Sequence, residues 1–231
     1  MSTPWLNYLT YAYEHGLRLS ANGTKGDGGR TVSTASEYTD PRVTRTIAAL
    51  QRAVVELASR QPASRITVAE LAARAGVTRA TFYNRYSTPL DPLVAALYAD
   101  LETGHRLEDR RRAEGYPGPE LLRLAITEVA DHVERFTSVY RHALDDPADR
   151  GVYDALVRHF NDYALAFLAR ADSACVPDAD HEVMAQFLAH GFAGAIRAWL
   201  RDPAATKDDL VDAAVACAPA WWADAGVSED G

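Results

Sequence analysis

Cysteines, long apolar runs and β-type alternation are all scarce in this sequence, and each shortage excludes a class of protein. Only two cysteines occur among 231 residues, Cys175 and Cys217, and they lie in no metal-ligand spacing. Each stands in an apolar helical stretch, which predicts two buried free thiols and a reducing compartment. No apolar run approaches the roughly 20 residues that a membrane-spanning helix needs. We therefore expect a cytoplasmic protein with neither a membrane span nor a signal peptide.

Motifs of the common catalytic and nucleotide-binding sites are also missing. The glycine-rich stretch from Ala21 to Arg30 follows no apolar strand and lacks the spacing of a phosphate-binding loop. His181 and Glu182 begin like the zinc motif of metalloproteases, but Ala185 stands where the second histidine would be. An enzyme would need a nucleophile, a base or metal ligands in one constellation. We find no motif for one, and expect no catalytic activity, no metal and no cofactor.

The net charge of −8 is unevenly distributed along the chain. Residues 41–90 hold eight arginines and only two acids, Glu56 and Glu70, which gives this segment a charge of +6. The rest of the chain holds 16 basic and 30 acidic residues. Such a distribution is expected of a protein that meets phosphate with one end. A solvated basic surface is the alternative explanation.

Helical periodicity dominates from Pro41 onward, so we predict an all-α fold. Composition divides the chain into an N-terminal extension (1–40), a small helical domain (41–90) and a larger helical domain (91–231). The extension combines a short helix, Trp5 to Leu19, with a glycine-rich tether, and either docks on the protein or is a disordered tail. In the small domain we expect one helix from Arg42 to Arg60 and two short helices between Thr67 and Tyr86. In the larger domain we expect a helix from Asp91 onward and further helices over 120–135, 138–144, 147–171, 179–201 and 206–223.

The stretch TVAELAARAGVTRATFYNRY, residues 67–86, indicates two short helices joined by a tight turn. Thr67 and Thr78 can cap these helices, and Gly76 can take the positive φ that the turn tends to require. With Leu71 and Phe82 facing inward, the arginine, asparagine and threonine side chains of the second helix face outward. These side chains read base edges in the major groove, and no acid interrupts them. The segment is therefore expected to bind DNA.

These residues resemble the tetracycline-repressor (TetR) family of bacterial regulators. The resemblance is highly specific in AGVTRATFYNRY, residues 75–86, and covers the preceding helix as well. It implies a homodimer in which residues 41–90 form a helix-turn-helix DNA-binding domain. Residues 91–231 would form the helical domain for effector binding and dimerisation. The use of two lysines against 22 arginines is consistent with a GC-rich bacterial genome.

The resemblance also implies which residues contact operator DNA. Tyr83 matches a position whose hydroxyl commonly meets the DNA backbone, whereas Phe82 and Tyr86 match core positions. Between Ser87 and Asp91 the family usually has a lysine that contacts phosphate, and this chain has none. The expected contacts are Arg45, Thr67, Thr78, Arg79, Thr81, Tyr83, Asn84 and Arg85.

The last two long helices are apolar on more than one face. In the helix over 179–201, Val183, Phe187 and Ile196 widen the main apolar stripe, so this helix must be covered on two sides. Such a helix pair suits a four-helix dimer interface, and completion of a monomeric core is the alternative. The predicted interface consists of Met184, Leu188, Gly191, Ala195, Trp199, Leu210, Ala214, Cys217 and Trp221.

A pocket for a small-molecule effector is expected among the helices between Glu120 and Trp199. For each candidate residue, ordinary core packing is the alternative. Repression is the commoner outcome in the family, so we predict a repressor that the effector releases from a palindromic operator; activation stays open. A helical interaction module without DNA binding would leave the arginines of residues 41–90 unexplained. The candidate pocket residues are Phe136, Tyr140, Tyr153, His159, Tyr163, Phe167 and His190.

Overall fold

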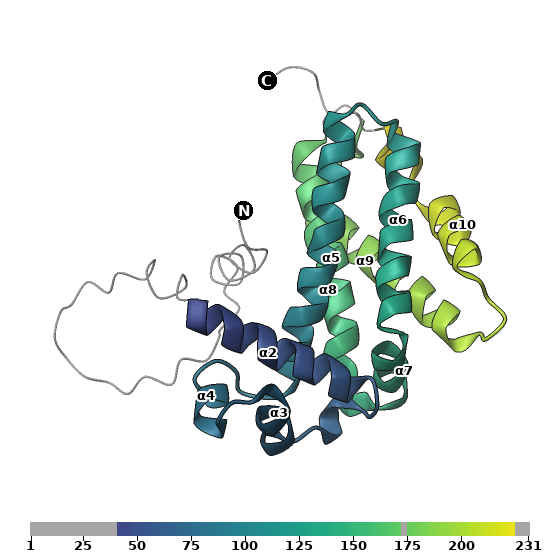
Figure 1. The fold of residues 1–231 in the computed structure, drawn as a ribbon. Helices are drawn as coiled ribbons and strands as arrows, with labels where there is room; N and C mark the ends of the chain where they lie inside the picture. Colours follow the sequence, from purple (N-terminus) through teal and green to yellow (C-terminus); the bar gives the residue numbers. More distant parts are fainter. Residues whose placement is uncertain (1–40, 172–174, 225–231) are drawn as a thin grey trace. The chain divides into compact units, whose positions relative to one another are not determined.

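The computed structural model describes residues 41–171 and 175–224, and all regular structure in this part of the chain is helical (Figure 1). The predicted all-α fold is confirmed. The extension helix and tether expected within residues 1–40 lie outside the described residues. No helix in the described ranges is both long and apolar enough to cross a membrane.

Contacts divide the chain into two units, Met1–Ala99 and Asp100–Gly231. This division falls inside helix α5 (Leu90–Ala113), whereas composition placed the boundary at the start of that helix. Helix α5 therefore contributes residues to both units.

The described part of the first unit is built on helix α2 (Pro41–Ala58), which buries Leu50, Val54 and Leu57 along one stripe. Spacing of three and four residues places these side chains on one helical face. Two short helices follow. Helix α3 (Val68–Ala75) packs against α2, and helix α4 (Arg79–Tyr83) packs against α3. A single 3₁₀ turn, η2 (Ala63–Arg65), connects α2 to α3.

Backbone geometry confirms the predicted turn between α3 and α4. Gly76 has φ 70° and ψ 30°, a left-handed conformation that L side chains rarely adopt. A Cβ atom at this position would meet nothing within 4 Å, so backbone conformation rather than space requires glycine there. Thr67 accepts a hydrogen bond from the Glu70 backbone N–H at 3.2 Å, and Thr78 accepts one from the Thr81 N–H at 3.1 Å. Both predicted caps are therefore present.

The second unit contains the C-terminal part of α5 and the helices that follow it. Helices α8 and α9 pack along each other extensively, while α6 packs against α10 and α11 (Figure 1). The bounds of these elements are α6 (Gly118–Arg135), α7 (Thr137–Asp145), η3 (Pro147–Asp149), α8 (Arg150–Arg170), α9 (His181–Arg201), α10 (Lys207–Cys217) and α11 (Ala220–Asp224).

The single helix predicted over 206–223 is wrong, because the chain breaks between α10 and α11. Pro219 follows Ala218, whose ψ of 141° is extended. A proline disfavours helical backbone at the residue before it and lacks the N–H that a continuing helix needs. The break allows the indole of Trp222 to stack on Phe167 of α8, with ring centroids 4.3 Å apart and planes 3° apart.

The prediction of two buried thiols is also wrong, since Cys175 and Cys217 are both exposed. Cys175 lies between α8 and α9, outside either helix, although its neighbours are apolar. Cys217 is the last residue of α10, where no further helical turn covers it.

Candidate DNA-binding surface and effector cavity

Helix α4 and the two residues after it present a nearly continuous polar surface. Arg79 and Asn84 are exposed, and Tyr83 is 59% exposed. The helix is shorter than predicted, because Asn84 is already its C-cap and Arg85, half-buried, lies beyond it. The structure nevertheless brings six of the eight predicted DNA contacts into one segment, residues 78–85. Arg45 lies on α2 and Thr67 at the start of α3, and both are exposed.

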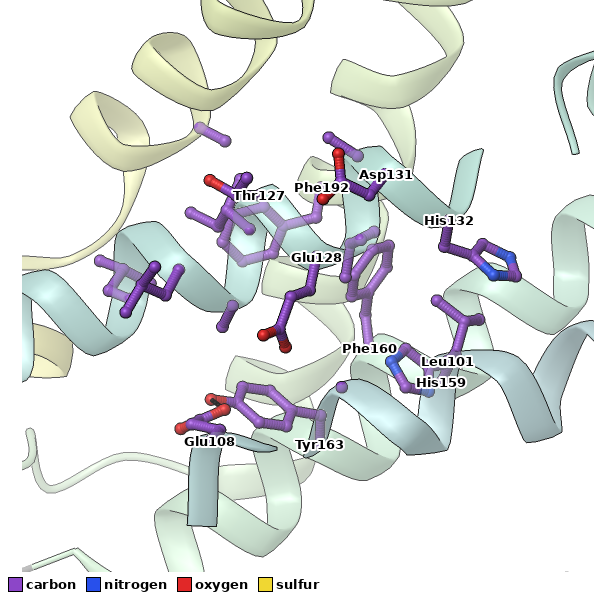
Figure 2. A pocket seen from close by; sticks show the side chains of 18 of the residues that line it. Leu101, Glu108, Thr127, Glu128, Asp131, His132, His159, Phe160, Tyr163 and Phe192 are labelled. Atoms are coloured by element: carbon purple, nitrogen blue, oxygen red, sulfur yellow. Dashed lines mark hydrogen bonds between the residues drawn. The ribbon is translucent and has the colours of Figure 1, made fainter. Parts of the chain in front are cut away.

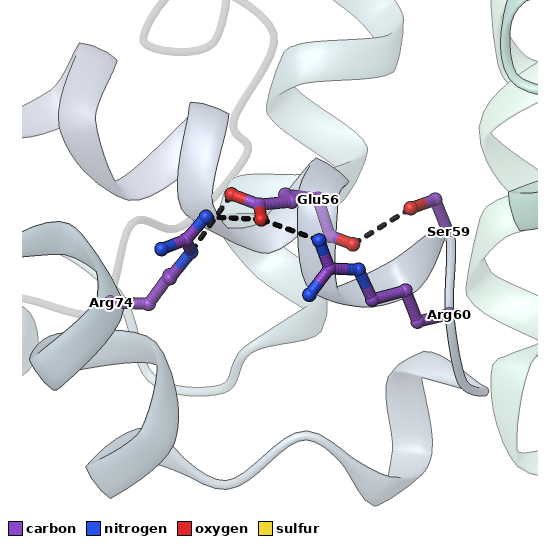
Figure 3. Close-up of polar contacts among 4 residues, drawn as sticks. All are labelled: Glu56, Ser59, Arg60 and Arg74. Atoms are coloured by element: carbon purple, nitrogen blue, oxygen red, sulfur yellow. Dashed lines mark hydrogen bonds and ion pairs between the residues drawn. The ribbon is translucent and has the colours of Figure 1, made fainter.

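Two arginines of the basic segment bind the carboxylate of Glu56 on α2, and one of them, Arg74, joins α3 to α2 (Figure 3). Arg74 of α3 donates from Nε to Oε2 of Glu56 at 2.8 Å and also binds the other carboxylate oxygen. Arg60 donates to the same carboxylate at 2.9 Å. The hydrogen bond from Arg74 lowers the pKa of Glu56, and the charge of Arg60 acts in the same direction. Both arginines belong to the basic segment that was expected to meet phosphate, whereas the structure gives them a local partner.

The stretch from Ser87 to Asp91, which lacks the lysine of the family pattern, forms the turn before α5. The backbone N–H groups of Ser87 and Thr88 each donate to Oδ2 of Asp91 at 2.8 Å. The hydroxyl of Thr88 donates to Oδ1 of the same carboxylate at 2.8 Å. Asp91 therefore holds the turn that joins the α4 segment to α5.

The second unit contains a cavity of about 520 Å³ (Figure 2). Its lining comes from α5, α6, α8, α9, α10 and α11 and is largely apolar. Of the seven predicted pocket residues, His159 and Tyr163 line it. Its other polar and charged lining residues are Asp100, Thr103, Glu108, Arg111, Thr127, Glu128, Asp131, His132 and Arg135.

The other five predicted pocket residues lie elsewhere, and each position has a physical reason. Phe167 is buried against Trp222 in the core, and His190 is exposed on α9. Tyr140 lies behind the cavity wall, hydrogen-bonded to His132. The ring of Phe136, where α6 gives way to α7, packs 4.9 Å from that of His132. Tyr153 is half-buried on α8 and does not line the cavity.

The charged stripe of α6 is the feature that sequence reasoning missed. Glu128, His132 and Arg135 recur at helical spacing, which is typical of a solvated face. In the structure all three line the cavity instead. The only available signal was the presence of both apolar and charged residues on more than one face of this helix.

One polar network crosses from α6 to α5 and α7. His132 is 1% exposed, and its Nδ1 lies 2.7 Å from Oδ2 of Asp100 while its Nε2 lies 2.7 Å from the Tyr140 hydroxyl. Arg135 donates to the same Asp100 oxygen at 2.5 Å. Burial lowers the pKa of His132, although Asp100 opposes this effect. Burial would raise the pKa of Asp100, but hydrogen bonds from His132 and Arg135 outweigh it and lower that pKa.

A second network links α5, α6 and α8. The Tyr163 hydroxyl donates to Oε2 of Glu108 at 2.6 Å, and Arg112 donates to Oε1 at 2.7 Å. Burial raises the pKa of Tyr163, and the adjacent Glu108 charge raises it further. Arg111 donates from Nη1 to Oε1 of Glu128 at 2.5 Å.

The predicted dimer residues fall into two groups. Leu188, Leu210 and Ala214 are buried inside the second unit and line its cavity, so these three residues of the predicted dimer interface face the chain's own core. Periodicity identifies apolar faces but not which of them meets the protein's own core. Met184, Ala195, Trp199 and Trp221 are half-buried, and Gly191 and Cys217 are exposed.

The most exposed apolar side chains of α9 are not among the predicted interface residues. Val183 is 67% exposed and Phe187 is 79% exposed, and both belong to the stripe that widens the main apolar face. Gly191 and Gly194 are exposed on the same helix, and an added Cβ at either would meet nothing within 4 Å.

No group of three or more histidine, cysteine, aspartate or glutamate side chains within residues 41–171 and 175–224 is arranged to hold a metal ion. The acidic and histidine side chains of the cavity instead bind one another, arginine, lysine or tyrosine. This chemistry suits binding of a ligand through charge and hydrogen bonds.

Comparison with known proteins agrees with this geometry. Residues 51–88, from the middle of α2 through α4, match the family of bacterial regulatory proteins described as the tetR family. The chain thus carries the helix-turn-helix segment of the TetR family, formed by α3 and α4. This segment supports a DNA-binding regulator. No curated protein matches the chain in sequence.

Solved structures share the all-α fold of this chain at low identity. Thermus thermophilus FadR, a repressor crystallised with lauroyl-CoA, gives a TM-score of 0.57 at 20% identity, over 74% of this chain and 91% of that one. FadR from Bacillus halodurans, a fatty acid degradation regulator, gives 0.50 at 14% identity, over 77% and 94%. A transcriptional regulator from Cytophaga hutchinsonii gives 0.50 at 13% identity, over 81% and 100%.

Proposed function

We propose that the chain is a dimeric, sequence-specific transcriptional repressor that a small-molecule effector releases from a palindromic operator. One observation carries this proposal: the same chain holds an exposed α4 segment without acidic residues and, in its other unit, a cavity of about 520 Å³. The α4 segment suits base reading in the major groove. The cavity has the size and apolar lining of a small-molecule site.

In this proposal α4 enters the major groove of the operator. Arg79 and Asn84 would contact base edges, and the exposed Tyr83 and the two capping threonines would contact the phosphate backbone. In a dimer the two recognition helices would reach half-sites about 34 Å apart, one turn of the duplex. Each phosphate that the protein neutralises would steepen the salt dependence of affinity by roughly one unit of log-log slope.

The exposed face of α9 supports the proposal of a dimer. Two apolar side chains as exposed as Val183 and Phe187 on one helix mark a surface that a partner commonly covers. Gly191 and Gly194 would allow a second helix to approach closely at the same face. A two-fold pairing of α9, with α10 beside it, gives a closed dimer in which each surface meets its own copy.

The network around His132 supports coupling between the two sites. His132 lines the cavity and is bonded to Asp100, which directly follows Ala99, the last residue of the DNA-binding unit. A ligand that displaces His132 changes the environment of this point in α5. If the effector weakens DNA binding by some factor, DNA must weaken effector binding by the same factor.

The test is selection of fragments from a pool of genomic DNA at moderate salt. The intact chain should enrich a palindromic site, and a double variant, Arg79→Ala with Asn84→Ala, should not. Arg150→Ala removes an exposed arginine of α8 and is the matched control, which should enrich the same site. Failure of the intact chain to enrich any site, or equal enrichment by the double variant, would contradict the proposal. Binding to a protein partner with no salt dependence would instead favour an interaction module.

A further inference from the structure

Among the lining residues of the cavity that the structure describes, no cation is available to bind an anionic ligand. Four carboxylates and two guanidinium groups line it. Arg111 is bound to Glu128 and Arg135 to Asp100, each at 2.5 Å, so both lining arginines already have a carboxylate partner within the cavity wall. A phosphate or carboxylate head group would have to break one of these pairs before it could be bound.

Glu128 presents one carboxylate oxygen to the cavity. Oε1 accepts the hydrogen bond from Arg111, and no donor among the described residues reaches Oε2. Oε2 lies across from Gly104 of α5, where a Cβ atom would come within 3.0 Å of it. In Figure 2 the side chain projects from α6 toward the hydroxyl of Tyr163 and the carboxylate of Glu108. The position is therefore open to a hydrogen-bond donor that the ligand itself would bring.

The electrostatic environment of Glu128 favours a positive ligand over a negative one. Burial raises the pKa of its carboxyl, and the negative charges of Glu108 and Asp131 raise it further, against the opposing effect of Arg111. A positive group beside Oε2 would stabilise the ionised carboxylate, whereas an anion would be repelled by it.

The remainder of the cavity suits an apolar body. The rings of Phe160 and Phe192 pack 5.7 Å apart in its wall, and Leu188, Ile196 and Trp222 line it as well. Aromatic faces also attract cations through their quadrupole. A volume of about 520 Å³ lies within the range of sites for drug-sized ligands.

We propose that the effector of this cavity is an apolar molecule carrying a basic amine, whose ammonium group donates to Glu128 Oε2 while its body packs against Phe160 and Phe192. This inference rests on the proposed effector role of the cavity. It distinguishes the chain from Thermus thermophilus FadR, whose structure holds lauroyl-CoA, an anionic ligand.

The test compares ligands that share one hydrocarbon tail and differ in the charge of the head group. Dodecylamine, 1-dodecanol, dodecanoate and lauroyl-CoA are titrated separately into the full chain, without DNA and at micromolar concentration. Calorimetry gives the dissociation constants, and tryptophan fluorescence reports occupancy because Trp222 lines the cavity. Dodecylamine should bind about tenfold or more tightly than dodecanol, as expected for one charged hydrogen bond, and both anions should bind more weakly than dodecanol.

Glu128→Gln keeps the shape of the side chain and removes its charge. It should weaken dodecylamine binding about ten- to a hundredfold while the affinity for dodecanol stays within about twofold. It should also strengthen dodecanoate binding, because Arg111 loses its partner. Glu120→Gln, an exposed position of the same helix, is the matched control and should bind all four probes as the parent does.

Dodecylamine binding no tighter than dodecanol binding, a Glu128→Gln variant that retains the amine preference, or no binding of any probe would each overturn the inference. Because these measurements contain no DNA, they are separate from the selection of an operator. A chain that selects a palindrome yet prefers lauroyl-CoA would refute only the amine inference. A chain that prefers the amine yet selects no DNA would refute only the proposed function.

Discussion

His132 of α6 and Asp100 of α5 share a hydrogen bond of 2.7 Å beside the cavity. The second ring nitrogen of His132 meets the hydroxyl of the buried Tyr140. A neutral imidazole satisfies both partners, donating from Nδ1 to the carboxylate and accepting at Nε2 from the hydroxyl. Protonation would turn Nε2 into a donor, and the hydroxyl of Tyr140 would then have to rotate its proton away. The protonation state of one buried ring therefore determines two contacts between helices.

We expect acid to destabilise the fold through His132. Its pKa is lower in the folded chain than its usual 6.5, so the unfolded chain binds the additional proton and stability falls as pH drops below that value. Because of this residue, the free energy of unfolding should change by at most about 1.4 kcal/mol per pH unit. Urea unfolding across this range should show the slope in the parent and a smaller one in His132→Gln. His190→Gln, an exposed control, should keep the parental slope; a parental slope in His132→Gln would refute this assignment.

Gly76→Ala should destabilise the DNA-binding unit by about 1 to 2 kcal/mol, the cost of a left-handed backbone for a residue with a Cβ. The measurement is thermal or denaturant unfolding. Gly76→Asn should retain more stability than the alanine variant, since asparagine tolerates this conformation better. Equal loss in both variants would mean that steric crowding, which the structure does not show, is responsible.

Removal of the Arg74 guanidinium should loosen α3 from α2. Arg74→Ala should lower Tm, and the difference should shrink with added salt because the pair is partly exposed. The pKa of Glu56 is lowered, so the contribution of the pair is present above pH 4.5 and is lost as pH falls through the lowered value. A double-mutant cycle with Glu56→Gln isolates the pair, and additive effects of the two changes would show that it contributes nothing.

Phe187→Glu should convert the proposed dimer to a monomer and abolish operator binding, since it places a charge on the exposed apolar face of α9. Sedimentation velocity measures the first effect and fluorescence anisotropy with operator DNA the second. Tyr116→Glu changes another exposed aromatic, 40% exposed after α5, and should leave the assembly unchanged. A Phe187→Glu chain that sediments like the parent would place the interface elsewhere.

Local chemistry explains what could be predicted from the sequence. The caps at Thr67 and Thr78 and the glycine turn depend on residues within four positions of one another, so they were recognisable from the sequence alone. Burial of Phe82 and Tyr86 followed from helical spacing and the same small core.

The cavity could not be predicted in the same way, because its residues come from helices far apart in the sequence. Which face of α6 turns inward depends on how α10 and α11 cover it. Helical spacing alone therefore does not mark Glu128 and His132 as cavity residues. The break before α11 was predictable from Pro219 and was missed because the apolar periodicity continues across it.

The exposure of Cys175 and Cys217 gives the chain two natural attachment points for spectroscopic labels. Both belong to the second unit, and no other cysteine occurs in the sequence to compete for a maleimide dye or a spin label. A single Cys→Ser substitution leaves one site, so distances within a labelled assembly can be measured on an otherwise unaltered protein.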